Sequence, residues 1–192
     1  MEWILASASP RRKALLADLI DHFEIIPSQA NEDFLGYSSA KSLVYDLASM
    51  KAEEVAKRPE NAGKVVIGSD TVVAYKGVAL GKPRDEEDAF RMLKMLSRNK
   101  HSVYTGVSFH LAQEGSYRVY TKVDKTDVYF NELSDEWIWT YIKDGSPMDK
   151  AGAYGIQDGG LVKKIKGSYT NVVGFPLELV EKMMKKVERS WT

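Results

Sequence analysis

Two long strand-like segments follow each other late in the chain, and they constrain its fold more than any other feature. Residues 101–112 and 117–130 are joined at Glu114-Gly115-Ser116, which is typical of a hairpin between antiparallel strands. Their mixed apolar and polar pattern indicates that one face of this hairpin is exposed. Shorter apolar runs alternate with helical patterns before the hairpin. This order predicts an α/β fold, with a mixed, strongly twisted sheet and helices packed on it.

The other elements follow from local periodicity and from capping residues. Apolar runs predict strands at residues 3–6, 23–26 and 65–67, and a hairpin over residues 72–75 and 78–80. Helices are predicted after Ser9-Pro10, over residues 39–57, after Asp85, after Ser134 and after Pro176. A strand pair is expected around Gly167.

The composition excludes several classes of protein. The chain has no cysteine and only three histidines, without metal-ligand spacing, so thiolate chemistry and a zinc centre are not expected. Its 27 basic and 27 acidic residues balance, which argues against a partner such as nucleic acid or a membrane surface. No apolar run approaches the roughly 20 residues of a membrane helix, and no signal peptide is evident. We therefore expect a cytoplasmic protein, with residues 1–192 forming one domain.

A first candidate site lies in the segment Ser7-Ala8-Ser9-Pro10-Arg11-Arg12-Lys13. It places three cations in the first turn of a helix, where the helix dipole favours acids instead. Free amides, serine hydroxyls and arginines at a helix N-terminus can form a phosphate cradle. The alternative is a solvated basic turn.

A second candidate is Gly68-Ser69-Asp70-Thr71, a polar stretch between two apolar runs. If the first run ends as a strand here, Asp70 lies at the edge where open α/β sheets place their active sites. Its carboxylate could bind a divalent cation or activate water. The alternative is an Asx turn at a strand end.

Further candidates carry less information in isolation. Lys51 falls on the apolar stripe of its helix and could simply extend to solvent, and Lys82 and Glu32 lie in loops. The glycine-rich stretch 149–157 allows close backbone approach to a ligand, and Gln157 offers a donor and an acceptor that suit a base edge. Taken together, these carboxylates, cations and glycines fit metal-assisted chemistry on a polyphosphate.

Several of these stretches resemble the Maf family of nucleoside triphosphate pyrophosphatases, first described as inhibitors of septum formation. The similarity extends over essentially the whole chain and is most specific in Ser7-Ala8-Ser9-Pro10-Arg11-Arg12 and in Asp149-Lys150-Ala151-Gly152-Ala153-Tyr154-Gly155-Ile156-Gln157. Further matching stretches are Lys51-Ala52, Gly68-Ser69-Asp70-Thr71-Val72-Val73, Gly81-Lys82-Pro83, Tyr104-Thr105-Gly106-Val107 and Gly174-Phe175-Pro176-Leu177.

The resemblance implies cleavage of a nucleoside triphosphate between its α- and β-phosphates with Mg²⁺ or Mn²⁺. It implies an elongated α/β fold like that of inosine triphosphate pyrophosphatases, with a cleft between two lobes. It also implies roles for individual residues: Asp70 as proton acceptor and metal ligand, Glu32 as the second acidic ligand, Ser7, Arg12, Lys51 and Lys82 on the phosphates, and Arg11, Thr71 and Gln157 in substrate choice.

The branch of the family that acts on dTTP and UTP is the better match, rather than the branch that acts on 7-methyl-GTP. The chain has Asn31-Glu32 where the family often has an acidic pair. The alternative function is a regulator of cell division that binds nucleotide without needing turnover. A homodimer is compatible with either function.

Overall fold

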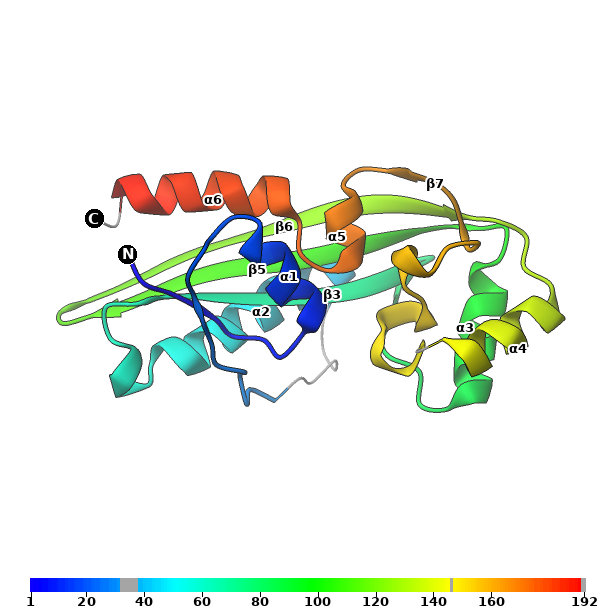
Figure 1. The fold of residues 1–192 in the computed structure, drawn as a ribbon, viewed down its shortest axis with the longest axis horizontal. Coiled ribbons are helices and arrows are strands. Elements are labelled where there is room, and N and C mark those ends of the chain that lie inside the picture. Colours follow the sequence, from blue (N-terminus) through cyan, green and yellow to red (C-terminus); the bar gives the residue numbers. More distant parts are fainter. Residues whose placement is uncertain (32–37, 146, 191–192) are drawn as a thin grey trace.

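A seven-stranded mixed sheet forms the centre of the computed structural model, which describes residues 1–31, 38–145 and 147–190 (Figure 1). The strand order is β2-β1-β3-β5-β6-β7, and β4 pairs with β3 beside this path. Strand β1 runs parallel to β2 and β3, whereas the remaining pairs are antiparallel. The strands are β1 (Trp3–Leu5), β2 (Glu24–Ile25), β3 (Val65–Tyr75), β4 (Val78–Leu80), β5 (Lys100–Gln113), β6 (Ser116–Phe130) and β7 (Val162–Lys166).

Six α-helices cover this sheet within the described part of the chain. Figure 1 shows α2 and α6 on opposite sides of the sheet at one end, and α3 with α4 at the other end. The helices are α1 (Pro10–Ala17), α2 (Ala40–Ala56), α3 (Glu86–Leu96), α4 (Asp135–Asp144), α5 (Tyr169–Val173) and α6 (Leu177–Ser190). None of the helices in the described ranges is long and apolar enough to span a bilayer.

The local signals in the sequence placed most of these elements correctly. Ser9, Asp85 and Ser134 each cap a helix through a side-chain oxygen that accepts a backbone N–H, as predicted. The long hairpin is present as β5 and β6, and the helix expected over residues 39–57 is α2. The mixed α/β fold with a sheet and flanking helices is confirmed.

Three details of the fold differ from the expectations. Residues 65–75 form one continuous strand, so Asp70 lies in the middle of β3 rather than at a strand end. Strand β5 is buried on both faces over residues 105–111, because α2 covers one face and the apolar residues around α1 and α6 cover the other. The chain after Gly167 forms the short helix α5 instead of a second strand.

Two glycines allow α2 to lie directly on the sheet. A Cβ atom at Gly68 of β3 would lie 2.2 Å from the Ala48 carbonyl oxygen, and one at Gly106 of β5 would lie 2.0 Å from the Val44 carbonyl oxygen. Both contacts are with helix backbone, which has no flexible end that could move aside. The close packing of α2 therefore depends on the absence of side chains at these two positions.

The edge of β3 is open over residues 68–72. Strand β5 pairs with β3 along residues 65–74 and so occupies one edge of β3 throughout. On the other edge, β1 pairs only with residues 65–67 and β4 only with residues 73–75. Because neither short strand reaches the centre of β3, the polar stretch around Asp70 lies at a gap in the sheet.

Two hydrophobic cores lie on either side of this gap along the sheet. The α1–α6 core includes Leu5, Leu16, Ile67, Phe109 and Phe175. The α3–α4 core includes Leu93, Val103, Phe130, Ile138 and Leu161.

We expect Gly106→Ala to destabilise the fold by about 3 kcal/mol, the upper end of the usual cost of overpacking, because the new methyl group must push α2 away from β5. Urea unfolding measures the change in the free energy of unfolding. Gly81→Ala is the matched control, since no heavy atom lies within 4 Å of a Cβ built there, and its effect should stay within about 0.5 kcal/mol. Equal stability of the two variants would contradict the close packing of α2.

Candidate active site

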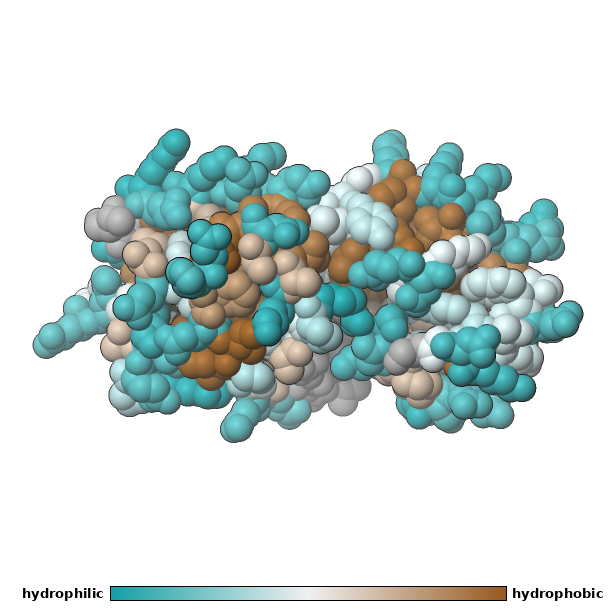
Figure 2. Space-filling model, in the orientation of Figure 1, coloured by the Kyte–Doolittle hydropathy of each residue, from teal (hydrophilic) through white to brown (hydrophobic). Residues whose placement is uncertain are grey.

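A cavity of about 1000 Å³ lies at the open edge of β3. This volume is at the upper end of the range of about 300–1,000 Å³ that is usual for small-molecule sites. Its lining includes Leu43 of α2, Arg12 of α1, Val103 of the α3–α4 core and Gly174 after α5. Figure 2 shows that this face of the molecule narrows between its two broader ends. This cavity, which we call the cleft, is lined by α1 and α2 as well as by residues of the α3–α4 core.

A buried ion pair lies at the centre of the cleft. The Lys51 Nζ atom donates to Asp70 Oδ1 at 2.7 Å, and the two residues are only 8% and 6% exposed. Lys51 reaches Asp70 because α2 contacts β3 directly at Gly68, two residues before Asp70. The sequence predicted only that Lys51 lies on the apolar stripe of its helix. In the folded protein, its side chain points toward the Asp70 carboxylate instead of solvent.

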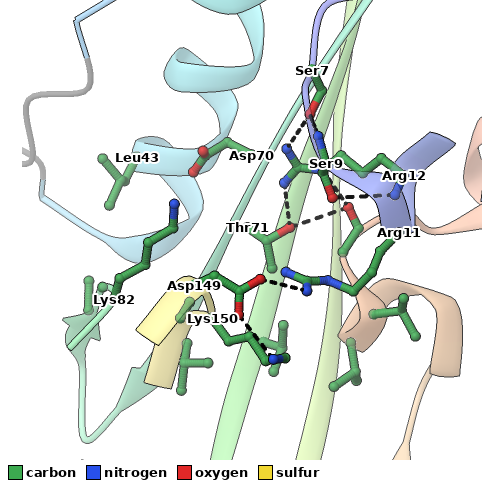
Figure 3. A pocket seen from close by; sticks show the side chains of 18 of the residues that line it. Ser7, Ser9, Arg11, Arg12, Leu43, Asp70, Thr71, Lys82, Asp149 and Lys150 are labelled. Carbon is green, nitrogen blue, oxygen red and sulfur yellow. Dashed lines mark hydrogen bonds and ion pairs between the residues drawn. The ribbon is translucent and has the colours of Figure 1, made fainter. Parts of the chain in front are cut away.

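Arg12 forms a second group of contacts on the opposite face of β3. Its Nε atom donates to the Gly174 carbonyl at 3.0 Å, and its two terminal nitrogens donate to Ser7 Oγ at 3.3 Å and to Thr71 Oγ1 at 3.1 Å. Strand periodicity explains this arrangement, because neighbouring residues Asp70 and Thr71 point to opposite faces of the sheet. At the open edge, both faces contribute to one cavity (Figure 3).

Arg11 reaches across the cleft. Its NH1 atom donates to Asp149 Oδ2 at 3.0 Å, and Lys150 Nζ donates to the other oxygen of the same carboxylate at 3.0 Å. Burial alone would raise the pKa of Asp149, but the hydrogen bonds from Lys150 and Arg11 outweigh it and hold that pKa below its ordinary value. This carboxylate therefore links α1 to the glycine-rich segment.

Lys82 and Gln157 line the same cavity from the side of the α3–α4 core. Figure 3 shows the side chains of Lys82 and Asp70 directed toward the same open space. Lys82 is exposed, and it forms no ion pair or hydrogen bond with another described residue. Gln157 is also exposed and belongs to a short 3₁₀ turn, Ile156–Asp158. The predicted site residues in the described ranges thus all line one cavity.

One described carboxylate inside the cleft, that of Asp70, is of the type that binds a hard divalent cation together with a substrate. No group of three or more acidic or histidine side chains in the described ranges could hold a metal ion. Mg²⁺ is nevertheless commonly bound by one or two carboxylates together with substrate phosphates and water. Asp70 offers such a carboxylate inside the cleft. Glu32, the other expected ligand, lies outside the described residues.

Several contacts in the cleft were not assigned from the sequence. The Gly174 carbonyl accepts from Arg12 and Ser69, and Asp149 and Lys150 form the pair with Arg11. All three residues belong to stretches that the sequence analysis had singled out. Their roles could not be predicted because each contact joins segments more than a hundred residues apart, except the local pair of Asp149 with Lys150.

This fold and this cleft define an α/β protein with a cation-rich cavity that surrounds one buried carboxylate, an arrangement suited to a phosphorylated small molecule. A family model described as Maf-like protein matches residues 2–187, and the chain belongs to that family. The family predicted from the sequence motifs is confirmed.

Relatives of known name cover nearly the whole chain. The chain is 50% identical over 183 residues to the dTTP/UTP pyrophosphatase of Thermococcus onnurineus (strain NA1), a match that covers 94% of this chain and 95% of the relative. It is 42% identical over 187 residues to the dTTP/UTP pyrophosphatase of Clostridium kluyveri (strain ATCC 8527 / DSM 555 / NBRC 12016 / NCIMB 10680 / K1), covering 96% of each. Among solved structures, the Staphylococcus aureus Ham1 protein has a similar fold, with a TM-score of 0.51 and 14% identity over 97% of this chain and 99% of that chain.

We expect Lys51→Met to destabilise the protein by about 3–5 kcal/mol, because it leaves the buried Asp70 carboxylate without this partner. The double variant Lys51→Met/Asp70→Asn removes both charges and should recover most of that loss. Urea unfolding of the wild type, both single variants and the double variant gives the coupling free energy. Additive effects of the two substitutions would show that the pair does not act as a unit.

Proposed function

We propose that this protein is a nucleoside triphosphate pyrophosphatase that hydrolyses dTTP and UTP to the monophosphate and pyrophosphate. The observation that carries the proposal is the buried Lys51–Asp70 pair at the centre of a cleft lined by further cations. Relatives that are 42–50% identical over nearly their whole length are named dTTP/UTP pyrophosphatases, which supports the same reaction and substrates.

In the proposed reaction, Asp70 accepts a proton from the attacking water. The water oxygen forms a bond to the α-phosphorus, and the bond from that phosphorus to the bridging oxygen breaks, so that pyrophosphate leaves with the electron pair. Lys51 orients the Asp70 carboxylate through their 2.7 Å hydrogen bond. Arg12 and Lys82 bind phosphate oxygens and stabilise the charge that develops on them.

We propose that Asp70, together with Glu32, holds Mg²⁺ or Mn²⁺ when substrate is bound. A bound divalent cation would neutralise phosphate charge and act as a Lewis acid on the phosphate oxygens. Residues 1–192 would work as one unit, because the cleft takes its lining from α1 as well as from residues of the α3–α4 core.

The experiment that tests this function is pyrophosphate release by the purified protein with Mg²⁺, measured for dTTP, UTP, CTP, GTP and 7-methyl-GTP. We expect Asp70→Asn to lower kcat by about 10²–10⁴-fold, the usual cost of losing a general base, while dTTP still binds. Isothermal titration calorimetry with dTTP measures that binding. Asp46→Asn, which removes an exposed carboxylate of α2 that does not line the cleft, is the matched control and should leave kcat unchanged.

Near-normal turnover by Asp70→Asn would exclude Asp70 as the base. A wild-type protein that binds nucleotide but releases no pyrophosphate from any triphosphate would instead support the regulator without turnover.

We propose that Gln157 contributes to the choice of base. It lines the cleft, and its amide carries a donor and an acceptor side by side, as pyrimidine recognition requires.

Gln157→Glu replaces the donor with an acceptor, and we expect kcat/KM for dTTP and UTP to fall about 5- to 150-fold, equivalent to one unpaired polar group. Competition kinetics over the same triphosphates measures the change. Gln113→Glu introduces the same charge at the exposed end of β5 and serves as the control. An equal loss for all five nucleotides would contradict a role in base selection.

A further inference from the structure

A buried hydroxyl lies behind the cleft, at a position where the strand pattern favours an apolar side chain. Thr105 of β5 is 0% exposed and does not line the cavity. Its neighbours on the same strand face are Val103 and Val107, both buried in the hydrophobic cores. Burying a hydroxyl is unfavourable unless it is hydrogen-bonded, so the two bonds that Thr105 forms indicate a specific role.

These two bonds connect opposite sides of the Arg12 site. Thr105 lies directly opposite Thr71 in the β3–β5 ladder, and the two Oγ1 atoms are 3.0 Å apart. Thr105 Oγ1 also donates to the backbone carbonyl of Asn171 in α5 at 3.0 Å. Thr71 in turn accepts from Arg12, and Gly174, at the end of α5, also accepts from Arg12.

The direction of the hydrogen bonds follows from counting protons. Each threonine hydroxyl has one proton, and a backbone carbonyl can only accept. Because Thr105 donates its proton to the Asn171 carbonyl, Thr71 must donate the hydrogen bond between the two threonines. The alternative acceptor for the Thr71 proton, the Gly174 carbonyl, is farther away at 3.4 Å. Thr71 therefore presents its oxygen lone pairs to the guanidinium of Arg12.

We infer that Thr105 is a positioning residue for phosphate binding, acting through Thr71 on Arg12. Its hydroxyl fixes the rotamer in which Thr71 accepts from Arg12, and its bond to Asn171 holds α5, which carries the Gly174 carbonyl, against the same site. The inference rests on the proposed function in that the ligand is the phosphate chain of a triphosphate. Since phosphates carry no base information, the effect of Thr105 should be the same for every nucleotide.

The test uses Thr105→Val, which keeps the shape of the side chain but removes the hydroxyl, and Thr105→Ser, which keeps the hydroxyl. Binding of pyrophosphate and of dTTP is measured by isothermal titration calorimetry, and melting temperatures are recorded for every variant. We expect Thr105→Val to weaken both ligands about 3- to 10-fold, the usual worth of one hydrogen bond, and Thr105→Ser to remain within about 2-fold of the wild type. If Thr105→Val does not fold, Thr105→Ala removes the same hydroxyl without placing a methyl group against the Asn171 carbonyl.

A double-mutant cycle with Thr71→Val separates positioning from general loosening of the core. If Thr105 acts through Thr71, the double variant should bind pyrophosphate at least about 3-fold more tightly than the product of the two single effects predicts. Multiplicative effects, or equal losses in Thr105→Val and Thr105→Ser, would overturn the inference.

The same measurements distinguish this inference from the proposed function. A wild type that binds pyrophosphate but releases none from any triphosphate would overturn the function, and the cycle would still decide the role of Thr105. Normal turnover by the wild type, together with multiplicative effects of the two substitutions in the cycle, would overturn the role of Thr105 but not the proposed function. A wild type that binds neither pyrophosphate nor dTTP would overturn both.

Discussion

The direct packing of α2 on the sheet is the constraint on which the cleft depends. Gly68 and Gly106 leave no room for a Cβ atom beneath the carbonyls of Ala48 and Val44, so the helix backbone rests on the backbone of β3 and β5. This short distance brings Lys51 within 2.7 Å of Asp70. Two opposite charges can be buried there because each offsets the desolvation of the other. A larger side chain at either glycine would separate the pair as well as weaken the core.

The open edge of β3 determines where this pair can meet a ligand. Strands β1 and β4 cover the two ends of that edge and leave residues 68–72 paired only with β5, on the opposite edge. At such a gap, consecutive residues of one strand can serve one cavity from opposite faces of the sheet, as Asp70 and Thr71 do. The gap thus joins two groups of polar residues that a fully paired strand would keep apart.

The cations in the first turn of α1 go against the usual preference of a helix for acidic residues there, and their long-range contacts explain why. Arg11 and Arg12 occupy the positive end of the helix dipole, which is unfavourable for the helix itself. Their side chains extend to partners in other elements, Asp149 for Arg11 and Gly174 for Arg12. The local cost is offset by long-range hydrogen bonds, and the result is a group of oriented cations at the cleft.

Sequence patterns alone were enough to predict the mixed α/β fold, the long hairpin, the helix caps at Ser9, Asp85 and Ser134, and the family to which the chain belongs. These follow from residues close together in the chain, so periodicity and capping chemistry were sufficient to predict them. Motif matching also selected the residues that line the cleft. Three features became evident only in the folded protein: Asp70 lies within a strand, residues 105–111 of β5 are buried on both faces, and Thr105 and Gly174 support the Arg12 site. The physical reason is that each of these depends on packing between distant segments, which decides which strand edge stays open and which side chains share a face.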